Sequence, residues 1–441
     1  MVSEVASKLG KLNLLDASVA ARKLARREIT AVSLLQDCLE HIAAREPTVH
    51  AWTVVDGAAA MQRARVLDSQ GPTGLLHGLP IAVKDLFDTV DMPTSYGSPI
   101  YAGHRPAWDA ASVALARAAG AIVVGKTVTT EFATFHPGPT CNPRNPQHTP
   151  GGSSSGSAAC VADCHVPLAF GTQTAGSIVR PAAFCGVVGY KPTFGTINRA
   201  GVKTISDSLD TVGVLARSVP DAALFAAALT GRRELFGDAP ATDVPRIGMC
   251  RTYEWSRAQP ETVSTFEDAG ARLRAAGASV RDVTLPPPFA GLVDAQLTIM
   301  VREVASSLAH ENLTHREALS ADMTKMIDAG LAVSPQQYDA ARTLAQSCRA
   351  MLRDVFNGLD VLIAPSAIGE APVGIAATGD PVFNRIWTLL HVPVVHVPVG
   401  QEPNGLPVGV TVVGGAGADH ATLRAAEWIH AQLGGREQGH E

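Results

Sequence analysis

Short apolar runs that alternate with helical stripes are the feature of this sequence that most restricts its fold. Residues 78–84, 121–125 and 246–249 are predicted to be short strands. Between the first two, residues 109–119 have the apolar spacing of a helix that ends at Gly120. Because strands that alternate with helices build sheets covered on both faces, the pattern predicts an α/β fold.

Helices are also predicted at the start of the chain and before its last strands. Apolar residues recur at helical spacing from residue 16 to residue 45, which indicates two packed helices. Another helix is predicted at 335–356, where Ser334 and Gln337 form the pattern of a capping box. Further predicted elements are strands at 278–285, 359–364, 393–399 and 408–413 and a closing helix at 421–433.

The length and composition of the chain are those of a globular protein with a large core. It has 441 residues, of which 46% are hydrophobic and 17% are charged. No internal repeat and no linker interrupts it, so we expect one domain over residues 1–441. Within it we distinguish N-terminal helices (1–75), a motif-rich core (76–231) and a C-terminal α/β part (232–441) that completes the sheet and the substrate pocket.

Charge and hydropathy argue against several classes of partner. The formal net charge is −5 and no segment forms a basic stripe, which argues against nucleic acid. No run approaches the ~20 apolar residues that a membrane span needs, and the first residues lack an apolar leader segment. We therefore expect a cytoplasmic protein that binds a small neutral or anionic molecule and no membrane.

The seven cysteines suggest neither disulfides nor a metal site. Their number is odd and they are scattered through apolar stretches, which is typical of reduced thiols in the cytosol. Cys160 and Cys164 lack the second pair of ligands that a zinc site requires. We expect no metal and no organic cofactor.

The stretch from residue 140 to residue 213 differs from the rest, because Gly, Ser, Thr and Pro dominate it. Such a stretch within a globular chain is usually a functional loop system. Two runs stand out in it, Pro-Gly-Gly-Ser-Ser-Ser-Gly-Ser at 150–157 and Gly-Thr-Gln-Thr-Ala-Gly-Ser-Ile-Val-Arg-Pro-Ala at 171–182. A third notable residue, Lys84, lies before them at the end of the apolar strand 78–84.

Taken together, these three segments resemble the amidase signature family, which has the same motifs in this order. Ser177 follows Ser153 by 24 positions, as in that family. The resemblance is detailed over residues 78–231, extends to the strands at 359–414, and is similar to a sub-branch of malonamidase-like and urethanase-like bacterial amidases. It implies a large twisted mixed β-sheet sandwiched between α-helices. It also implies hydrolysis of a C–N bond in small amides or carbamates (urethanes), in a protein that is often a homodimer.

The resemblance further implies a Ser-cisSer-Lys triad. A serine hydroxyl needs a neighbouring base, and this region has no obvious histidine and aspartate pair for that task. In the family's pattern Ser177 is the nucleophile that forms an acyl-serine intermediate, Lys84 is the base and Ser153 relays the proton. The peptide bond between Gly152 and Ser153 is then expected to be cis. Burial beside the apolar residues 81–83 lowers the pKa of a lysine, which makes Lys84 a usable base.

Small residues before Ser177 favour an oxyanion hole. The backbone amides of Thr174, Ala175 and Gly176 can approach a substrate carbonyl because their side chains are small. Ser155 is expected to be a supporting partner of Lys84.

Two linked positions depart from the family's commonest pattern. The family often has an aspartate four residues before the nucleophile, where this chain has Gln173. It often has an arginine two residues after the nucleophile, whereas here Arg180 lies three residues after Ser177. One hypothesis is that Arg180 binds a substrate carboxylate through its forked donors. The other is that it braces neighbouring loops.

Other interpretations of the motifs stay open. Residues 152–156 fit the nucleophile elbow of α/β-hydrolases with Ser154 as nucleophile, although the prolines before them argue against the strand that an elbow must follow. Residues 120–127 match the letters of a phosphate-binding P-loop but have the composition of a strand. Lys126, in the same run, is a rival to Lys84 that we interpret as structural.

The function has alternatives as well. The chain could be catalytically silent, or it could resemble the amidase-like component of a tRNA-dependent amidotransferase, which works with partner chains and supplies ammonia for tRNA-linked amidation. Ester hydrolysis is a further side activity that the same chemistry allows. The acyl pocket is expected to be built by residues 132–138, 285–333 and 383–391, which are less motif-like and leave the substrate unspecified.

Overall fold

A single mixed sheet is the frame of the protein. The computed structural model describes residues 11–237, 241, 243–401 and 405–434. The strands are β1 (Trp52–Val55), β2 (Pro80–Lys84), β3 (Ile122–Thr127), β4 (Leu168–Gln173), β5 (Val188–Lys191), β6 (Thr211–Ala216), β7 (Arg246–Cys250), β8 (Ser279–Val283), β9 (Val361–Pro365), β10 (Val394–Gln401) and β11 (Pro407–Val413). They form an 11-stranded sheet in the order β1-β3-β2-β4-β6-β5-β10-β11-β9-β7-β8.

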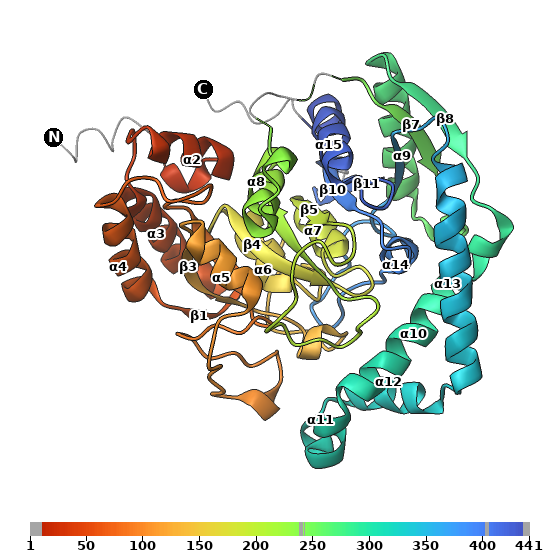
Figure 1. Ribbon diagram of the computed structural model, residues 1–441, viewed down its shortest axis with the longest axis horizontal. Coiled ribbons are helices and arrows are strands. Elements are labelled where there is room, and N and C mark those ends of the chain that lie inside the picture. The colour runs from red at the N-terminus through yellow and green to blue at the C-terminus, as the bar shows by residue number, and fades with distance from the viewer. Residues whose placement is uncertain (1–10, 238–240, 242, 402–404, 435–441) are drawn as a thin grey trace.

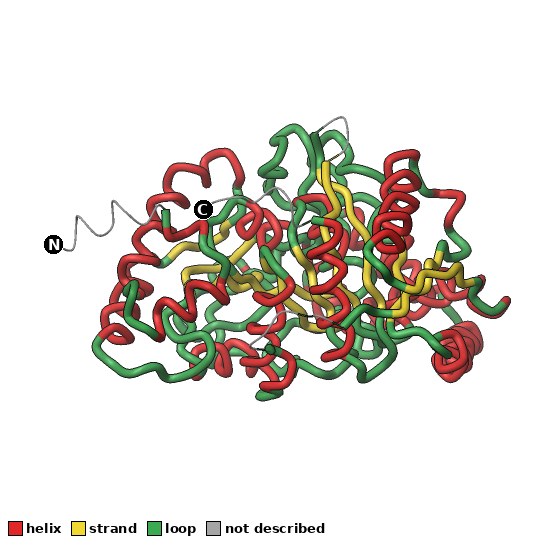
Figure 2. The backbone as a smooth tube through the Cα atoms, turned by 90° about the horizontal axis from the view of Figure 1, so that it is seen from above, coloured by secondary structure: helices red, strands yellow, loops and turns green. Residues whose placement is uncertain are grey.

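The direction of the strands changes across the sheet. Strand β2 pairs in parallel with β3 and β4, and β7 pairs in parallel with β8 and β9, whereas the other neighbours are antiparallel. Strands β2, β3, β4 and β6 are buried along their whole length, as expected where helices cover both faces. Figure 2 shows the strands running through the middle of the molecule with helices on either side.

The helices of the described part cover the sheet and extend beyond it. They are α2 (Ala17–Ala25), α3 (Ala31–Val49), α4 (Gly57–Asp68), α5 (Ala111–Ala118), α6 (Ser155–Ala162), α7 (Val179–Cys185), α8 (Val219–Thr230), α9 (Pro260–Ala275), α10 (Leu292–Ser307), α11 (Ala309–Thr314), α12 (Ala321–Ala332), α13 (Pro335–Val355), α14 (Val382–Leu389) and α15 (Asp419–Leu433). Helices α10 to α13 form an arm along one side of the molecule, and α10 also contacts α14 (Figure 1). None of the described helices is long and apolar enough to cross a membrane.

The structure confirms the predicted α/β fold with a large mixed sheet between helices. The predicted strands at 78–84, 121–125 and 246–249 correspond to β2, β3 and β7. The capping box before α13 is formed as expected, since Ser334 and Gln337 exchange side-chain and backbone hydrogen bonds. The two packed helices predicted at the start of the chain are present as α2, which packs mainly against α8, and α3, which packs mainly against α4.

The prediction of a loop system at 140–213 is wrong in its extent. This stretch contains α6, α7, β4, β5 and β6. Its small residues serve close packing of backbones: a Cβ added to Gly156 would lie 2.2 Å from the carbonyl oxygen of Ala51, and one added to Gly213 would lie 2.3 Å from that of Tyr190. Composition alone does not distinguish glycines that permit such contacts from glycines that loosen a loop.

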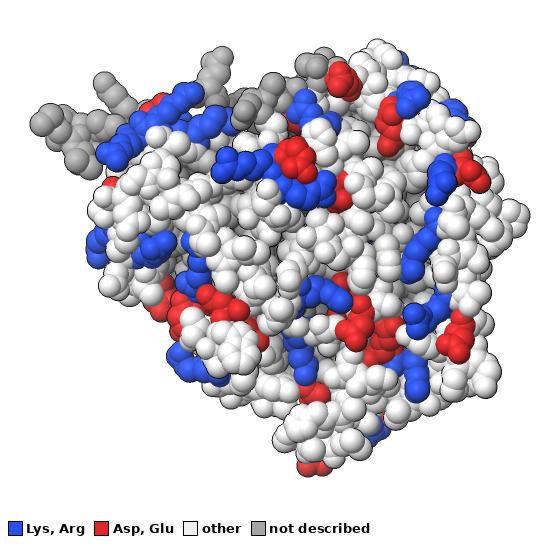
Figure 3. All heavy atoms as spheres, in the orientation of Figure 1, with Lys and Arg blue, Asp and Glu red and all other residues white. Residues whose placement is uncertain are grey.

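Charged side chains are interspersed on the surface. On the face drawn in Figure 3, Lys and Arg side chains lie among Asp and Glu side chains over most of the area. This mixture agrees with the small net charge of −5.

Candidate active site

The buried amine of Lys84 lies where two serine-bearing segments meet. Lys84 ends β2, the segment at 153–154 leads into α6, and Thr172 belongs to the neighbouring strand β4. The Lys84 Nζ donates to three hydroxyl oxygens, those of Ser153 at 2.8 Å, Ser154 at 3.1 Å and Thr172 at 2.7 Å. No ion pair joins Lys84 to a carboxylate of the described residues. When the amine is neutral, one of these contacts can reverse, and a serine hydroxyl then donates to Nζ.

The environment of Lys84 favours its uncharged form. Its side chain is 0% exposed. Burial lowers the pKa of Lys84 from 10.5 to about 7, and the negative charge of Asp210 opposes part of this change. Near pH 7 a large share of Lys84 is therefore uncharged and able to accept a proton.

The backbone at Gly152 and Ser153 is held by close packing. Their peptide bond is cis, as predicted. A Cβ added to Gly152 would lie 2.7 Å from Cγ2 of Thr378, and Gly151 has a φ of +80° and would bring a Cβ to 2.9 Å from Cα of Pro181. A residue with a Cβ is therefore disfavoured at both positions, at Gly152 by lack of space and at Gly151 by lack of space and by its positive φ.

Ser177 lies beside this cluster, in the turn between β4 and α7. The backbone N–H of Ser154 donates to the carbonyl of Ser177 at 3.3 Å, which joins the two serine motifs side by side. Ser177 is 6% exposed and lines a narrow cavity of about 10 Å³. The other residues of the cavity wall are Ala133, Thr134, Phe135, Thr174, Ala175, Arg180, Ile205, Met300 and Met326.

The cavity wall can be compared with the three stretches expected to form the acyl pocket. Two of them contribute, residues 132–138 through Ala133 to Phe135 and residues 285–333 through Met300 and Met326. The third, 383–391, forms most of helix α14, and it supports the segment at 174–176 from outside the cavity. The sequence pattern gave no signal for Ile205, which lies in a loop between β5 and β6.

Two of the three residues predicted for the oxyanion hole have free amides. Among the described residues, the N–H groups of Ala175 and Gly176 donate to no protein acceptor, and neither does that of Ser177, which is not among the residues predicted for the hole. The small side chains are needed there, because a Cβ on Gly176 would lie 2.4 Å from Oδ1 of Asn384. The turn therefore offers unused donors beside the Ser177 side chain.

Gln173 supports the turn rather than facing the cavity. Its Oε1 accepts from the N–H groups of Ile178 at 2.9 Å and Val179 at 3.0 Å, which are otherwise free donors at the start of α7. Its Nε2 donates to the hydroxyl of Thr388 at 2.9 Å. A neutral amide can both accept and donate in this way, so Gln173 binds the end of the turn that contains Ser177 and joins it to helix α14.

Arg180 braces loops through its two terminal nitrogens. Its Nη1 donates to the carbonyl of Gly379 at 2.6 Å, and its Nη2 donates to the carbonyl of Gly152 at 2.7 Å and to the hydroxyl of Thr378 at 3.1 Å. Burial and the nearby Arg385 lower the pKa of Arg180 to about 9. These contacts match the bracing hypothesis, while the position of Arg180 on the cavity wall leaves the carboxylate hypothesis as a prediction.

The expectation that Ser155 assists Lys84 is wrong. The Ser155 hydroxyl donates to the carbonyl of Val128 at 3.3 Å. Ser154 and Thr172 take the expected place beside Nζ. Ser155 is the first residue of α6, so its side chain leaves the backbone in a different direction from that of the preceding Ser154. Thr172 lies in the same motif as the predicted Thr174, two residues before it. Because residues two apart in an extended chain point to the same face, this spacing could have identified Thr172 as a site residue from the sequence.

The competing motifs do not form the structures they would need. No strand precedes Ser154 within residues 128–153, so a nucleophile elbow is absent there. Residues 122–127 are the buried strand β3 and cannot wrap a phosphate. Lys126 pairs with Asp85 at 2.9 Å and donates to the hydroxyl of Thr94 at 2.6 Å, both side chains of the ion pair being buried, which fits the structural role predicted for it.

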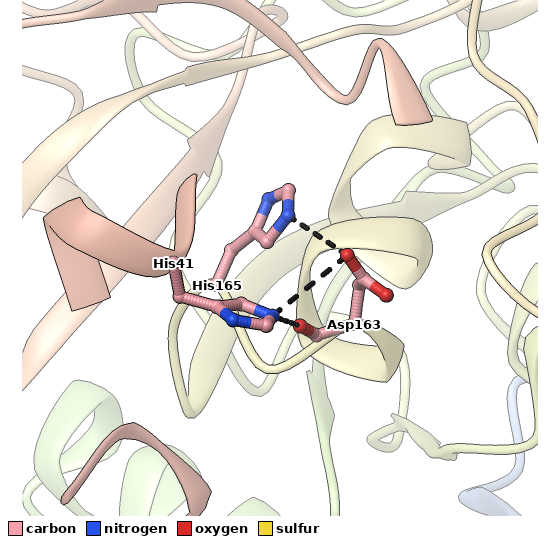
Figure 4. A group of neighbouring side chains, drawn as sticks. All are labelled: His41, Asp163 and His165. Carbon is pink, nitrogen blue, oxygen red and sulfur yellow. Dashed lines mark hydrogen bonds and ion pairs between the residues drawn. The ribbon is translucent and has the colours of Figure 1, made fainter. Parts of the chain in front are cut away.

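One group of potential metal ligands occurs among the described residues, formed by His41, Asp163 and His165 (Figure 4). Trp52 donates its indole N–H to Nδ1 of His165 at 3.0 Å, so the ring hydrogen of a neutral His165 lies on Nε2, which faces Asp163 at 3.1 Å. His41 Nε2 is 2.6 Å from the backbone carbonyl of Asp163 and must donate to it. Both nitrogens that face Asp163 are therefore hydrogen-bond donors with no lone pair for a metal ion.

This group is instead a brace between α3 and the end of α6. Arg45 donates to both carboxylate oxygens of Asp163, at 2.9 Å and 3.1 Å, which neutralises its charge. The seven cysteines are free thiols, and Cys160 and Cys164 have no ligand partners in this group.

Comparison with known proteins assigns the chain to a family. The family described as Amidase matches residues 33–423. The A subunit of the glutamyl-tRNA(Gln) amidotransferase of Mycobacterium ulcerans (strain Agy99) is 33% identical and aligns over 95% of this chain and 97% of its own length. The chain belongs to the amidase family.

Solved structures agree with this assignment. One described as an amidase is 31% identical, with a TM-score of 0.87 over 95% of this chain and 100% of the other. The native peptide amidase from Stenotrophomonas maltophilia is 30% identical, with a TM-score of 0.80 over 95% of this chain and 97% of its own.

Proposed function

We propose that the protein hydrolyses the C–N bond of a small amide or carbamate through an acyl intermediate on Ser177. The observation that carries the proposal is the buried Lys84 amine, 2.8 Å from Ser153 and surrounded by hydroxyl groups instead of carboxylates. A lysine whose pKa falls to about 7 is a general base in the range where the protein must work. Membership of the amidase family supports the reaction class.

In the proposed mechanism two serines and the lysine move one proton. Neutral Lys84 takes the proton of Ser153, Ser153 takes that of Ser177, and the Ser177 Oγ forms a bond to the carbonyl carbon. The carbonyl oxygen becomes an oxyanion that the free amides of the turn stabilise. The proton returns through Ser153 to the leaving nitrogen as the C–N bond breaks. Water then attacks the acyl-serine by the same route and releases the acid.

The wall of the cavity supports a small apolar acyl group. The narrow space beside Ser177 is bounded in part by the apolar side chains of Phe135, Ile205, Met300 and Met326. Such a wall favours a short apolar group over a long polar chain, because burying an unpaired polar group is costly. We propose amides and carbamates alike, since both pass through the same tetrahedral geometry.

Labelling with a fluorophosphonate probe tests the proposal. Wild type and Ser154→Ala should be labelled, and Ser177→Ala should not be. Hydrolysis of aryl amides and aryl carbamates by the wild type should then disappear in Ser177→Ala. Loss of labelling in Ser154→Ala alone would move the nucleophile to Ser154, and an unlabelled wild type would contradict the proposal.

A second candidate function is that of the amidase-like component of a tRNA-dependent amidotransferase. The alignment to the A subunit of the glutamyl-tRNA(Gln) amidotransferase over 95% of this chain favours it. Such a component depends on partner chains, whereas a hydrolase acts alone. Turnover of simple amides by the purified chain would favour the hydrolase, and glutamine hydrolysis that begins only when partner chains are added would favour the amidotransferase.

A further inference from the structure

We propose that Gln296 and Thr388 are positioning residues that hold two peptide groups of the turn at 174–176 with their N–H groups turned toward the reacting carbonyl. This inference rests on the proposed function, since it concerns the oxyanion hole of the same reaction. It assigns a role to two helices, α10 and α14, that lie far from the serine motifs in sequence.

The peptide group between Thr174 and Ala175 is held by Gln296. The Nε2 of Gln296 donates to the carbonyl of Thr174 at 2.9 Å, and the Gln296 side chain is 0% exposed. In a trans peptide the C=O and N–H groups point in opposite directions. A donor that fixes the carbonyl of Thr174 on one side therefore fixes the N–H of Ala175 on the other side.

The next peptide group is held by Thr388 in the same manner. The hydroxyl of Thr388 donates to the carbonyl of Ala175 at 2.8 Å, so the N–H of Gly176 is turned away from α14. The third peptide group needs no side chain, because the N–H of Arg180 donates to the carbonyl of Gly176 at 2.9 Å as α7 begins. Three consecutive carbonyls are thus bound from outside the turn.

The two positioning side chains are themselves oriented. Arg385 can only donate, and its Nη1 lies 2.5 Å from Oε1 of Gln296, which forces the amide nitrogen of Gln296 toward Thr174. Gln173 donates to the Thr388 oxygen, so the single Thr388 hydrogen is free for an acceptor. That hydrogen has two acceptors within reach, the carbonyl of Ala175 at 2.8 Å and that of Asn384 at 3.3 Å, and the shorter contact is the one to the turn.

A structural role alone makes a different prediction. If Gln296 and Thr388 only pack α10 and α14 against the turn, removing a hydrogen bond lowers the melting temperature and leaves the reaction of folded protein unchanged. If they position the donors, folded protein reacts more slowly, because the amides no longer meet the charge where it develops. The affinity for an uncharged ground-state ligand changes little in that case.

The test compares Thr388→Val, which keeps the shape and removes the hydroxyl, with Thr388→Ser, which keeps the hydroxyl. Removing a direct oxyanion donor costs about 10²–10³ in rate, so a misdirected donor should slow phosphonylation of Ser177 by a fluorophosphonate about tenfold in Thr388→Val. Thr388→Ser should recover the wild-type rate. With aryl amides the loss should appear in kcat rather than in KM.

Gln296→Glu provides a second, independent variant. It keeps an acceptor for Arg385 and loses the donor to Thr174, so phosphonylation of the folded variant should slow by a similar factor. Equal rates in folded Thr388→Val, Thr388→Ser and Gln296→Glu would overturn the inference and leave the proposed function intact. If Thr388→Val does not fold, Gln296→Glu decides by the same criterion. A wild type that the probe does not label would overturn the proposed function, and the inference with it.

Discussion

Two buried lysines lie on neighbouring strands and have opposite surroundings. Lys84 ends β2, and Lys126 lies beside it on β3, in register with Val83. Lys126 has a carboxylate partner, Asp85, at 2.9 Å, whereas Lys84 has three hydroxyl partners. Burial lowers the pKa of both lysines, but Asp85 opposes the change at Lys126 by stabilising the charged form.

A third lysine shows that burial alone does not make a base. Burial lowers the pKa of Lys191 to about 7, as it does for Lys84. The Nζ of Lys191 donates to the carbonyls of Pro192 at 2.8 Å and Val392 at 2.7 Å, and a carbonyl has no proton to give. What distinguishes Lys84 is the combination of a lowered pKa and hydroxyl partners that can pass a proton to it with the lack of a paired carboxylate among the described residues; Lys126 also contacts a hydroxyl, that of Thr94, but is paired with Asp85.

The largest expected effect is that of removing Lys84. Lys84→Met should keep the fold, because no buried carboxylate loses its partner, and should lower the rate of amide hydrolysis by about 10²–10⁴, the usual contribution of a general base. Circular dichroism checks the fold and steady-state kinetics check the rate. A variant that keeps more than a tenth of the activity would show that another group is the base.

The matched substitution at the neighbouring lysine should affect folding instead. Lys126→Met leaves Asp85 buried without its cation, which typically costs about 3–5 kcal/mol of unfolding free energy. Urea denaturation measures this loss. The folded fraction should retain the labelling rate of the wild type, and a folded but inactive Lys126→Met would contradict the division of roles between the two lysines.

The pH dependence of the reaction sharpens the same comparison. Only neutral Lys84 accepts a proton, so kcat/KM should rise with pH about tenfold per unit below pH 7 and level off above it. The folded pKa lies below the unfolded value of 10.5, so the folded chain binds fewer protons between about pH 7 and 10.5, and the free energy of unfolding rises with pH in that window. Lys191 contributes to stability with the same sign, so only the kinetic profile reports on Lys84. A rate that falls as pH rises from 6 to 8 would exclude a lysine base.

The sequence is informative where chemistry is local. Lys84 at a strand end and the serines at 153 and 177 lie in short motifs, so the family resemblance can be recognised, and can imply roles for them, without knowing the fold. The positions of β2, β3 and α13 follow from periodicity and capping, which are also local. The family resemblance adds the cis peptide bond, which no local pattern would give.

The remainder of the site depends on distant contacts that local patterns cannot specify. Gln296 meets Thr174 across 122 positions, and Thr388 meets Ala175 across 213. Both lie on helices whose inner faces can only be identified once the sheet is assembled. The error at Ser155 is of another kind, because the direction of a side chain changes at the first residue of a helix and the sequence does not mark that residue sharply.

The smallest predicted effect is that of removing the Ser154 hydroxyl, which contacts Lys84 where Ser155 was expected to do so. Ser154 donates to the carbonyl of Thr172 at 3.3 Å and accepts from Lys84 at 3.1 Å, but it is not in the proposed proton path. Losing one such hydrogen bond costs about 1 kcal/mol, so Ser154→Ala should slow amide hydrolysis roughly fivefold. Ser155→Ala is the matched control and should leave the rate within about twofold, because its hydroxyl binds only the backbone of Val128. The reverse order of the two rates would restore Ser155 as the partner of Lys84.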